Sequence, residues 1–163
     1  MNPAKMKKGS AATEHYTQFT RSLGEEPAFR AMSPKAQILY VWLRLEWHGD
    51  KANNNGKICL SHRQAATRLG VNRNSIGSAF FDLQAKGFIV VKKMAALGVQ
   101  GEGRCPEYEL TELPLPGAIP RVGRKLYQKW KPGCDFEVMK HPVKNPNGGK
   151  GRGQKSHLEP PSI

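Results

Sequence analysis

The stretch AATRLGVNRNSI, residues 65–76, decides the fold that the sequence predicts. Ala66 is small enough for two helices to cross closely, and Gly70, four residues later, permits the left-handed conformation of a tight turn. Val71 fills the gap between the two helices, and Ile76 is the first core residue of the second helix. The pattern therefore predicts two helices packed across a short turn, with the polar run after Val71 as the leading turn of the second helix.

The flanking sequence predicts a helix before this pair and a β-hairpin after it. Ser33 and Pro34 are typical of a helix N-cap and of the first helical position, and the helix should continue to about Trp47. The apolar run KICL, residues 57–60, predicts a short edge strand, in which Cys59 is expected to be a small core residue. The remaining expected elements are helices at about 62–69 and 72–86 and strands at 88–91 and 106–110, joined by a glycine-rich tip.

Residues 33–113 resemble the winged helix-turn-helix family, and within it DNA-binding proteins of proteobacterial plasmids, phages and integrative elements. The resemblance is carried by SPKAQILYVWL, NNNGKICLSHRQAATRLGVNRNSI and FFDLQAKGFIVV. It implies an α+β fold with a three-helix core and a small antiparallel sheet, and DNA binding through the third helix and the wing. Gly77 departs from the pattern because glycine inside a helix costs about 1 kcal/mol relative to Ala. It marks a close approach to DNA or to a neighbouring helix, or it is simply tolerated.

Candidate DNA contacts follow from the face of the recognition helix (about 72–86) that the core residues leave outside. The first turns of such a helix meet base edges, and the expected base-reading residues are Arg73, Asn74 and Ser78. The expected backbone contacts lie on this helix, on the preceding helix and in a basic wing (about 92–104): Asn72, Ser75, Arg63, Arg68, Lys92, Lys93 and Arg104. Alternatives remain, since Asn72 is also a helix cap and the other cations also suit a solvated surface.

The charge of the chain agrees with a nucleic-acid partner. Its 163 residues include 26 Lys or Arg and 13 Asp or Glu, a formal net charge of +13. Such an excess is typical of nucleic-acid binding, because each neutralised phosphate releases condensed counterions. A basic tail alone, or a ribosomal or membrane-surface protein, would give a similar number.

The chain divides into four predicted segments. Residues 1–15 are expected to be disordered, and residues 16–116 to form the winged domain. Residues 117–139 are a C-terminal extension, in which Leu126, Tyr127 and Trp130 suggest a short amphipathic helix docked on the domain. The Gly-, Pro- and Lys-rich residues 140–163 are expected to be a disordered basic tail. Between residues 121 and 163 there are ten Lys or Arg and three Asp or Glu, so this region holds +7 of the net charge.

Several classes of protein are disfavoured by the sequence. The absence of any run of about 18 apolar residues argues against a membrane span, and no secretory signal is present, so a bacterial cytoplasmic, nucleoid-associated protein is expected. The three cysteines lack zinc-site spacing, and an odd, sparse count suits a reducing cytosol. Neither a phosphate-binding loop nor a relaxase-type cluster of His and Tyr is found, so no cofactor, metal site or enzymatic activity is expected.

The leading hypothesis is therefore sequence-specific binding of double-stranded DNA, by a transcriptional regulator or accessory factor of a mobile element. Binding as a homodimer or as repeated monomers is expected, because one recognition helix reads few base pairs. Two alternatives remain: a protein-interaction or assembly module with a non-specific nucleic-acid-binding tail, and a plasmid or phage replication initiator.

Overall fold

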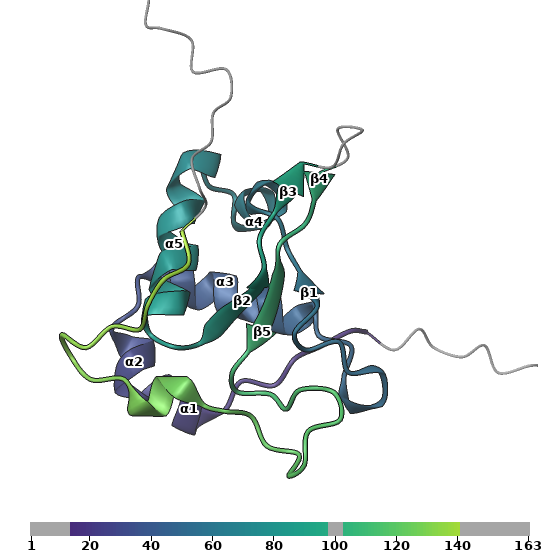
Figure 1. Cartoon of the computed structure of the whole chain (residues 1–163). Coiled ribbons are helices and arrows are strands. Elements are labelled where there is room, and N and C mark those ends of the chain that lie inside the picture. The colour runs from purple at the N-terminus through teal and green to yellow at the C-terminus, as the bar shows by residue number, and fades with distance from the viewer. Residues whose placement is uncertain (1–13, 98–102, 141–163) are drawn as a thin grey trace, which may run out of the picture.

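The computed structural model describes residues 14–97 and 103–140 and shows a mixed α+β fold (Figure 1). The helices are α1 (Arg21–Glu25), α2 (Pro27–Arg30), α3 (Pro34–Leu45), α4 (His62–Leu69) and α5 (Arg73–Ala85), with 3₁₀ turns η1 (Asp50–Ala52) and η2 (Leu126–Lys129). The strands are β1 (Ile58–Cys59), β2 (Ile89–Lys93), β3 (Ala96–Leu97), β4 (Gly103–Arg104) and β5 (Glu107–Leu110). Of the termini predicted to be disordered, residues 1–13 and 141–163 lie outside the described residues, as does the glycine-rich tip at 98–102.

Helix α3 begins where the sequence predicted and ends slightly earlier. The Ser33 hydroxyl accepts a hydrogen bond from the Ala36 N–H at 3.4 Å, with Pro34 as the first helical residue. At the other end the Asn54 amide donates to the Glu46 carbonyl at 3.0 Å. This side chain therefore satisfies a carbonyl at the helix terminus, and α3 stops at Leu45 rather than at the predicted Trp47.

The predicted turn between the two central helices is confirmed. Gly70 adopts the left-handed conformation, with φ of 65° and ψ of 31°, and the Val71 N–H donates to the Ala66 carbonyl at 3.0 Å. This bond ends α4 because it gives a partner to a carbonyl that the helix itself leaves without a hydrogen bond. Ala66 and Ile76 are buried and Val71 is half-buried, so the spacing of small and apolar residues does set the packing of α4 on α5.

The core is centred on Phe88, the fully buried residue that leads into β2. Its ring is 4.7 Å from that of Tyr127 and stacked on it, and it meets Tyr40 of α3 edge-on at 5.2 Å and Phe29 of α2 at 5.8 Å. Burial raises the pKa of the Tyr127 hydroxyl to about 12. One ring therefore joins α2, α3, the sheet and η2, and burial of such rings stabilises the fold substantially.

The sheet is small and antiparallel, with strand order β1-β5-β2. In the pairing of β2 with β5, Val91 faces Tyr108 and Lys93 faces Glu107, so Lys92 is the extra residue of a β-bulge. Strands β3 and β4 pair separately and form what we call the distal hairpin. The hairpin lies beside the start of α4, at the end of the molecule away from α1 and α2 (Figure 1).

The C-terminal extension packs on the core as predicted, and its short helix is a single 3₁₀ turn, η2. Tyr127 and Trp130 are buried and Leu126 is half-buried. The turn cannot begin earlier than Leu126 because Lys125 before it has a positive φ of 46°, which an α-helix does not allow, and it ends at Trp130, whose backbone is extended. Further along, the Phe136 N–H donates to the Ala85 carbonyl at the end of α5, at 2.9 Å.

The prediction that Cys59 is a core residue is wrong. Its side chain is exposed and forms a disulfide with Cys105, with 46 residues of separation and a Cα–Cα distance of 5.9 Å. The physical reason is the alternation of a strand, in which Ile58 and Leu60 point into the core and Cys59 points outward. The described part of the chain contains one further cysteine, Cys134, which is free and exposed.

Candidate nucleic-acid interface

A groove of about 740 Å³ lies between the first turns of α4 and α5 and the distal hairpin. Its described lining holds three arginines, Arg63, Arg73 and Arg104, and no carboxylate. We call it the arginine groove. The rest of its lining consists of Ser61, His62, Gln64, Ala95, Gly103, Cys105 and Pro106.

The wall formed by α4 is fixed by a capping box. The Ser61 hydroxyl accepts from the Gln64 N–H at 3.2 Å, and the Gln64 side-chain oxygen accepts from the Ser61 N–H at 3.0 Å. This reciprocal pair satisfies backbone donors at the helix start and leaves Arg63 exposed between them. His62 stacks on Phe80 of α5 with 4.5 Å between ring centroids, which anchors the same turn to the second helix.

The predicted base-reading residues lie on the first two turns of α5, and they differ in how they are bonded. Arg73 and Asn74 are exposed, and their side chains have no hydrogen-bond or ionic partner among the residues that the structure describes. The Ser78 hydroxyl donates to the Ser75 carbonyl at 2.9 Å and the Ser75 hydroxyl to the Asn72 carbonyl at 2.8 Å. The Asn72 side chain accepts from the Asn74 N–H at 2.9 Å, so Asn72 is the helix cap.

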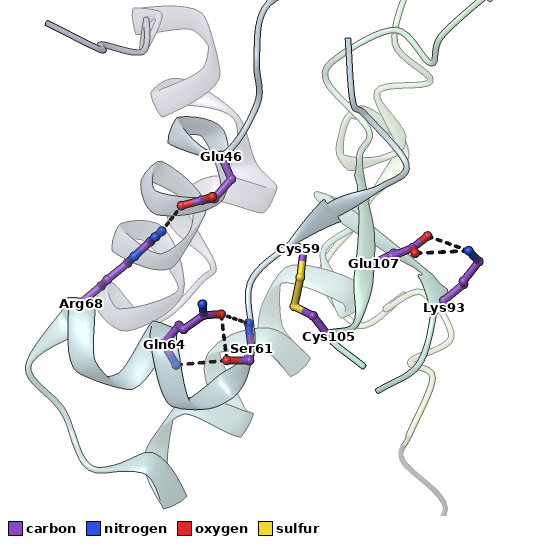
Figure 2. Close-up of a disulfide and its surroundings, with 8 residues drawn as sticks. All are labelled: Glu46, Cys59, Ser61, Gln64, Arg68, Lys93, Cys105 and Glu107. Carbon is purple, nitrogen blue, oxygen red and sulfur yellow. Dashed lines mark hydrogen bonds and ion pairs between the residues drawn. A yellow bond between two sulfur atoms is a disulfide. The ribbon is translucent and has the colours of Figure 1, made fainter. Parts of the chain in front are cut away.

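Three of the predicted backbone contacts are engaged in ion pairs. Arg68 is bonded to Glu46, and its guanidinium lies 5.2 Å from the ring centre of Trp42. Lys93 is paired with Glu107 at 3.1 Å; Figure 2 shows both ion pairs.

The third paired cation, Lys92, lies 3.7 Å from the carboxylate of Glu109. Arg63 and Arg104, in contrast, have no such partner within residues 14–97 and 103–140. The cations left without a local counterion among the predicted contacts are therefore the three of the arginine groove.

A second, apolar cavity of about 220 Å³ is lined by residues of α5, of β2 and β5, and of the chain at the end of the C-terminal extension. Phe81 lines it and is 44% exposed. Met94, which lies between β2 and β3, and residues 138–140 line the same cavity. Gly77 also borders it, and a Cβ added there would meet nothing within 4 Å in the described structure. A close approach of a neighbouring helix is therefore not the reason for this glycine.

The sequence analysis predicted neither the disulfide beside the groove nor the capping box that fixes the start of α4. The Ser-x-x-Gln spacing of residues 61–64 was a usable signal for the box. The strand alternation around Cys59 was a signal that its thiol points outward, but nothing local identified Cys105 as its partner.

No protein-family model matches the chain, and no similar curated protein or solved structure was found. Within residues 14–97 and 103–140, no three His, Cys, Asp or Glu side chains are grouped so that they could hold a metal ion. None of the helices described is both long and apolar enough to cross a bilayer.

Proposed function

We propose that the chain is a winged helix-turn-helix protein that binds double-stranded DNA sequence-specifically through the arginine groove. The observation that carries this proposal is the convergence of Arg63, Arg73 and Arg104 from three separate elements, with no carboxylate in the described lining. Uncompensated cations of one sign attract a polyanion, and phosphate contacts dominate the affinity of DNA-binding proteins. In this proposal α4 and α5 are the helix-turn-helix, α3 completes the three-helix core, and the β2–β5 hairpin with its distal part is the wing.

The side chains suit different tasks in such a complex. Arg73 and Asn74 project from the start of α5, where a recognition helix meets base edges in the major groove. Arginine bonds guanine bidentately and asparagine bonds adenine, each worth about 1–3 kcal/mol of discrimination. Arg63 on α4 and Arg104 on the wing line the same groove as Arg73 and suit phosphate contacts. The hydroxyls of Ser75 and Ser78 keep acceptor lone pairs beside their local bonds.

We further propose that the protein acts as a transcriptional regulator or accessory factor of a mobile element. A dimer, or several monomers side by side, would read a longer site than one helix does. Mapping the bound sites across a genome separates promoter control from binding at a replication origin or an attachment site. Sites confined to an origin would favour the replication-initiator alternative.

The first experiment measures the dependence of DNA affinity on salt. Duplexes selected from a random pool are titrated by fluorescence anisotropy with the full chain and with an R63Q/R73Q/R104Q variant. Each lost phosphate contact reduces the steepness of log K against log salt by about 0.9, so the variant, which loses the two phosphate contacts assigned to Arg63 and Arg104, should lose about 2 units of slope.

The matched control is R21Q/R30Q/R121Q, which removes the same charge from exposed arginines. Two of these lie on α1 and α2, at the other end of the molecule from the distal hairpin (Figure 1). This control should keep most of the slope. Equal slopes in the two triple variants would contradict a localised interface.

The second experiment separates sequence-specific binding from the alternative of an assembly module with a non-specific basic tail. Arg73→Ala and Asn74→Ala should each reduce the preference for the selected site over a scrambled duplex by about 5- to 150-fold. Deleting residues 141–163 should lower the affinity for both duplexes alike. If the deletion abolishes binding while the two helix variants bind normally, the tail is the nucleic-acid site and the proposal is wrong. Equal affinity for every duplex would refute sequence specificity.

A further inference from the structure

The disulfide joins the two walls of the arginine groove. Cys105 follows Arg104 directly in the chain and lines the groove, whereas Cys59 lies two residues before Ser61, the cap of α4. Figure 2 shows the bond between the capping box on one side and the Lys93–Glu107 pair of the hairpin on the other. A covalent link of this kind fixes the position of Arg104 relative to Arg63.

The disulfide lies at a gap in backbone pairing between the β2–β5 ladder and the distal hairpin. The β2–β5 ladder ends at Lys93 and Glu107, and the distal hairpin resumes only at Ala96 and Arg104. Met94 and Ala95 on one side, and Cys105 and Pro106 on the other, separate the two ladders. Proline has no N–H to donate, so regular pairing cannot continue through this position.

The neighbouring strand β1 does not extend across this gap. Its last pair with β5 is Cys59 with Glu107, so backbone hydrogen bonds from β1 stop just before the distal hairpin begins. The disulfide extends the connection of Cys59 by two residues, from its backbone partner Glu107 to Cys105. Among the described residues no β-ladder joins the distal hairpin to the sheet, so in the absence of the disulfide the two short chain segments at the gap would be its remaining covalent connection.

We propose that this disulfide is a thiol-responsive clamp on the arginine groove. In the oxidised protein the clamp holds Arg104 opposite Arg63 and Arg73; reduction releases the distal hairpin and weakens binding of DNA. This inference rests on the proposed function, because the groove is taken as the DNA site. Preorganised side chains bind more tightly because less freedom is lost on binding. In the reduced protein Arg104 and its segment must become ordered when DNA binds, and this cost corresponds to a loss of about 3- to 10-fold in affinity.

The exchange chemistry requires a dithiol, either a small molecule or a dithiol protein. Its thiolate attacks the exposed Sγ of Cys59, forming a mixed disulfide and displacing the Cys105 thiolate. The second thiol of the reductant then attacks its own bound sulfur, forming the oxidised dithiol and releasing the Cys59 thiolate. Two electrons pass to the protein, and the two thiolates take up two protons.

The test uses the full chain with Cys134→Ser, which removes the free exposed thiol and its side reactions. Mass spectrometry after alkylation should show no labelled cysteine before treatment with dithiothreitol and two labelled cysteines after it. Affinity for the selected duplex should be about 3- to 10-fold higher before reduction. The variant with Cys59→Ser and Cys105→Ser added should bind like the reduced protein and should not respond to the dithiol, with an unchanged far-UV spectrum.

Three outcomes overturn the clamp: cysteines that label fully before reduction, affinities within about twofold in the two states, or a double serine variant that still responds. A readout without DNA separates this inference from the proposed function. Amide hydrogen exchange at Ala96 and Arg104 should be faster after reduction, since the distal hairpin is then freer. If no duplex binds in either state, the proposed function fails, and the exchange rates alone decide the clamp: faster exchange supports it and unchanged exchange refutes it.

Discussion

Replacing Arg124 by alanine tests how firmly the C-terminal extension is joined to the sheet. Glu109 is fully buried on β5, the central strand, and Arg124 from the extension binds it with two hydrogen bonds. The Arg124 Nε and Nη2 atoms lie 2.7 Å and 2.7 Å from the two carboxylate oxygens. Without this guanidinium the buried carboxylate would keep Lys92, at 3.7 Å, as its ionic partner among the described residues.

The magnitude follows from the burial of the two partners. Removing one member of a buried ion pair typically costs about 3–5 kcal/mol, because the other charge is left uncompensated. The Arg124 side chain is 48% exposed, so water reaches the site and Lys92 remains nearby. We therefore expect Arg124→Ala to lower the free energy of unfolding by about 2–3 kcal/mol, below the fully buried range.

Urea denaturation followed by circular dichroism measures this loss. With a denaturant slope of about 1–3 kcal/mol per molar, the midpoint should fall by about 0.7–3 M. Arg121→Ala, an exposed arginine in the same segment, should change the stability by less than about 0.5 kcal/mol. Adding Glu109→Gln to Arg124→Ala should recover part of the loss, because no buried charge remains. A midpoint unchanged by Arg124→Ala, or a double variant no more stable than the single one, would refute the reasoning.

Other predictions concern two glycines and one carboxylate. Gly70→Ala should lower the free energy of unfolding by about 1–2 kcal/mol, because the φ of 65° at this position disfavours a side chain. Gly77→Ala should raise it by about 0.5–1 kcal/mol, because the added methyl group lies on a helix and meets open space. Thermal unfolding of the two variants and the unchanged protein measures both effects. Hydrogen bonds from Lys86 and Trp130 lower the pKa of Asp135. The ionised Asp135 therefore contributes to stability above the ordinary carboxyl pKa, and this contribution is lost as the pH falls through the lowered pKa of the folded protein. Acid should then change the fluorescence of Trp130 in the native protein but not in the Asp135→Asn variant.

The parts of the fold that the sequence predicted are those set by neighbouring residues. The turn around Gly70, the caps at Ser33 and Asn72 and the buried Ile76 depend on contacts a few residues away, and all are confirmed. The path of the extension was less predictable. Its 3₁₀ turn owes its position to Phe88, a residue about forty positions earlier, and no local pattern encodes that contact.

In the candidate site, too, features set by neighbouring residues were predicted and features set by distant residues were not. The exposed positions of Arg63, Arg73 and Arg104 followed from helical spacing and from the order of the strands. The pairing of Arg68 with Glu46 did not, because it joins α4 to the residue that follows α3, 22 positions earlier in the chain. The disulfide was missed for a similar reason, since a cysteine's partner depends on which strands become neighbours.

The burial of Glu109 has a consequence for the way the protein is made. During synthesis β5 leaves the ribosome before Arg124 does, so the nascent sheet contains a carboxylate whose main counterion has not yet emerged. Until the extension arrives, Lys92 at 3.7 Å is the one ionic partner of this carboxylate among the described residues, so we expect the sheet to be less stable before Arg124 binds it. We expect a premature stop just after the strand to give a product that contains every predicted DNA contact but is less stable than the full chain, because the buried Glu109 carboxylate would keep only the more distant Lys92 as its ionic partner among the described residues.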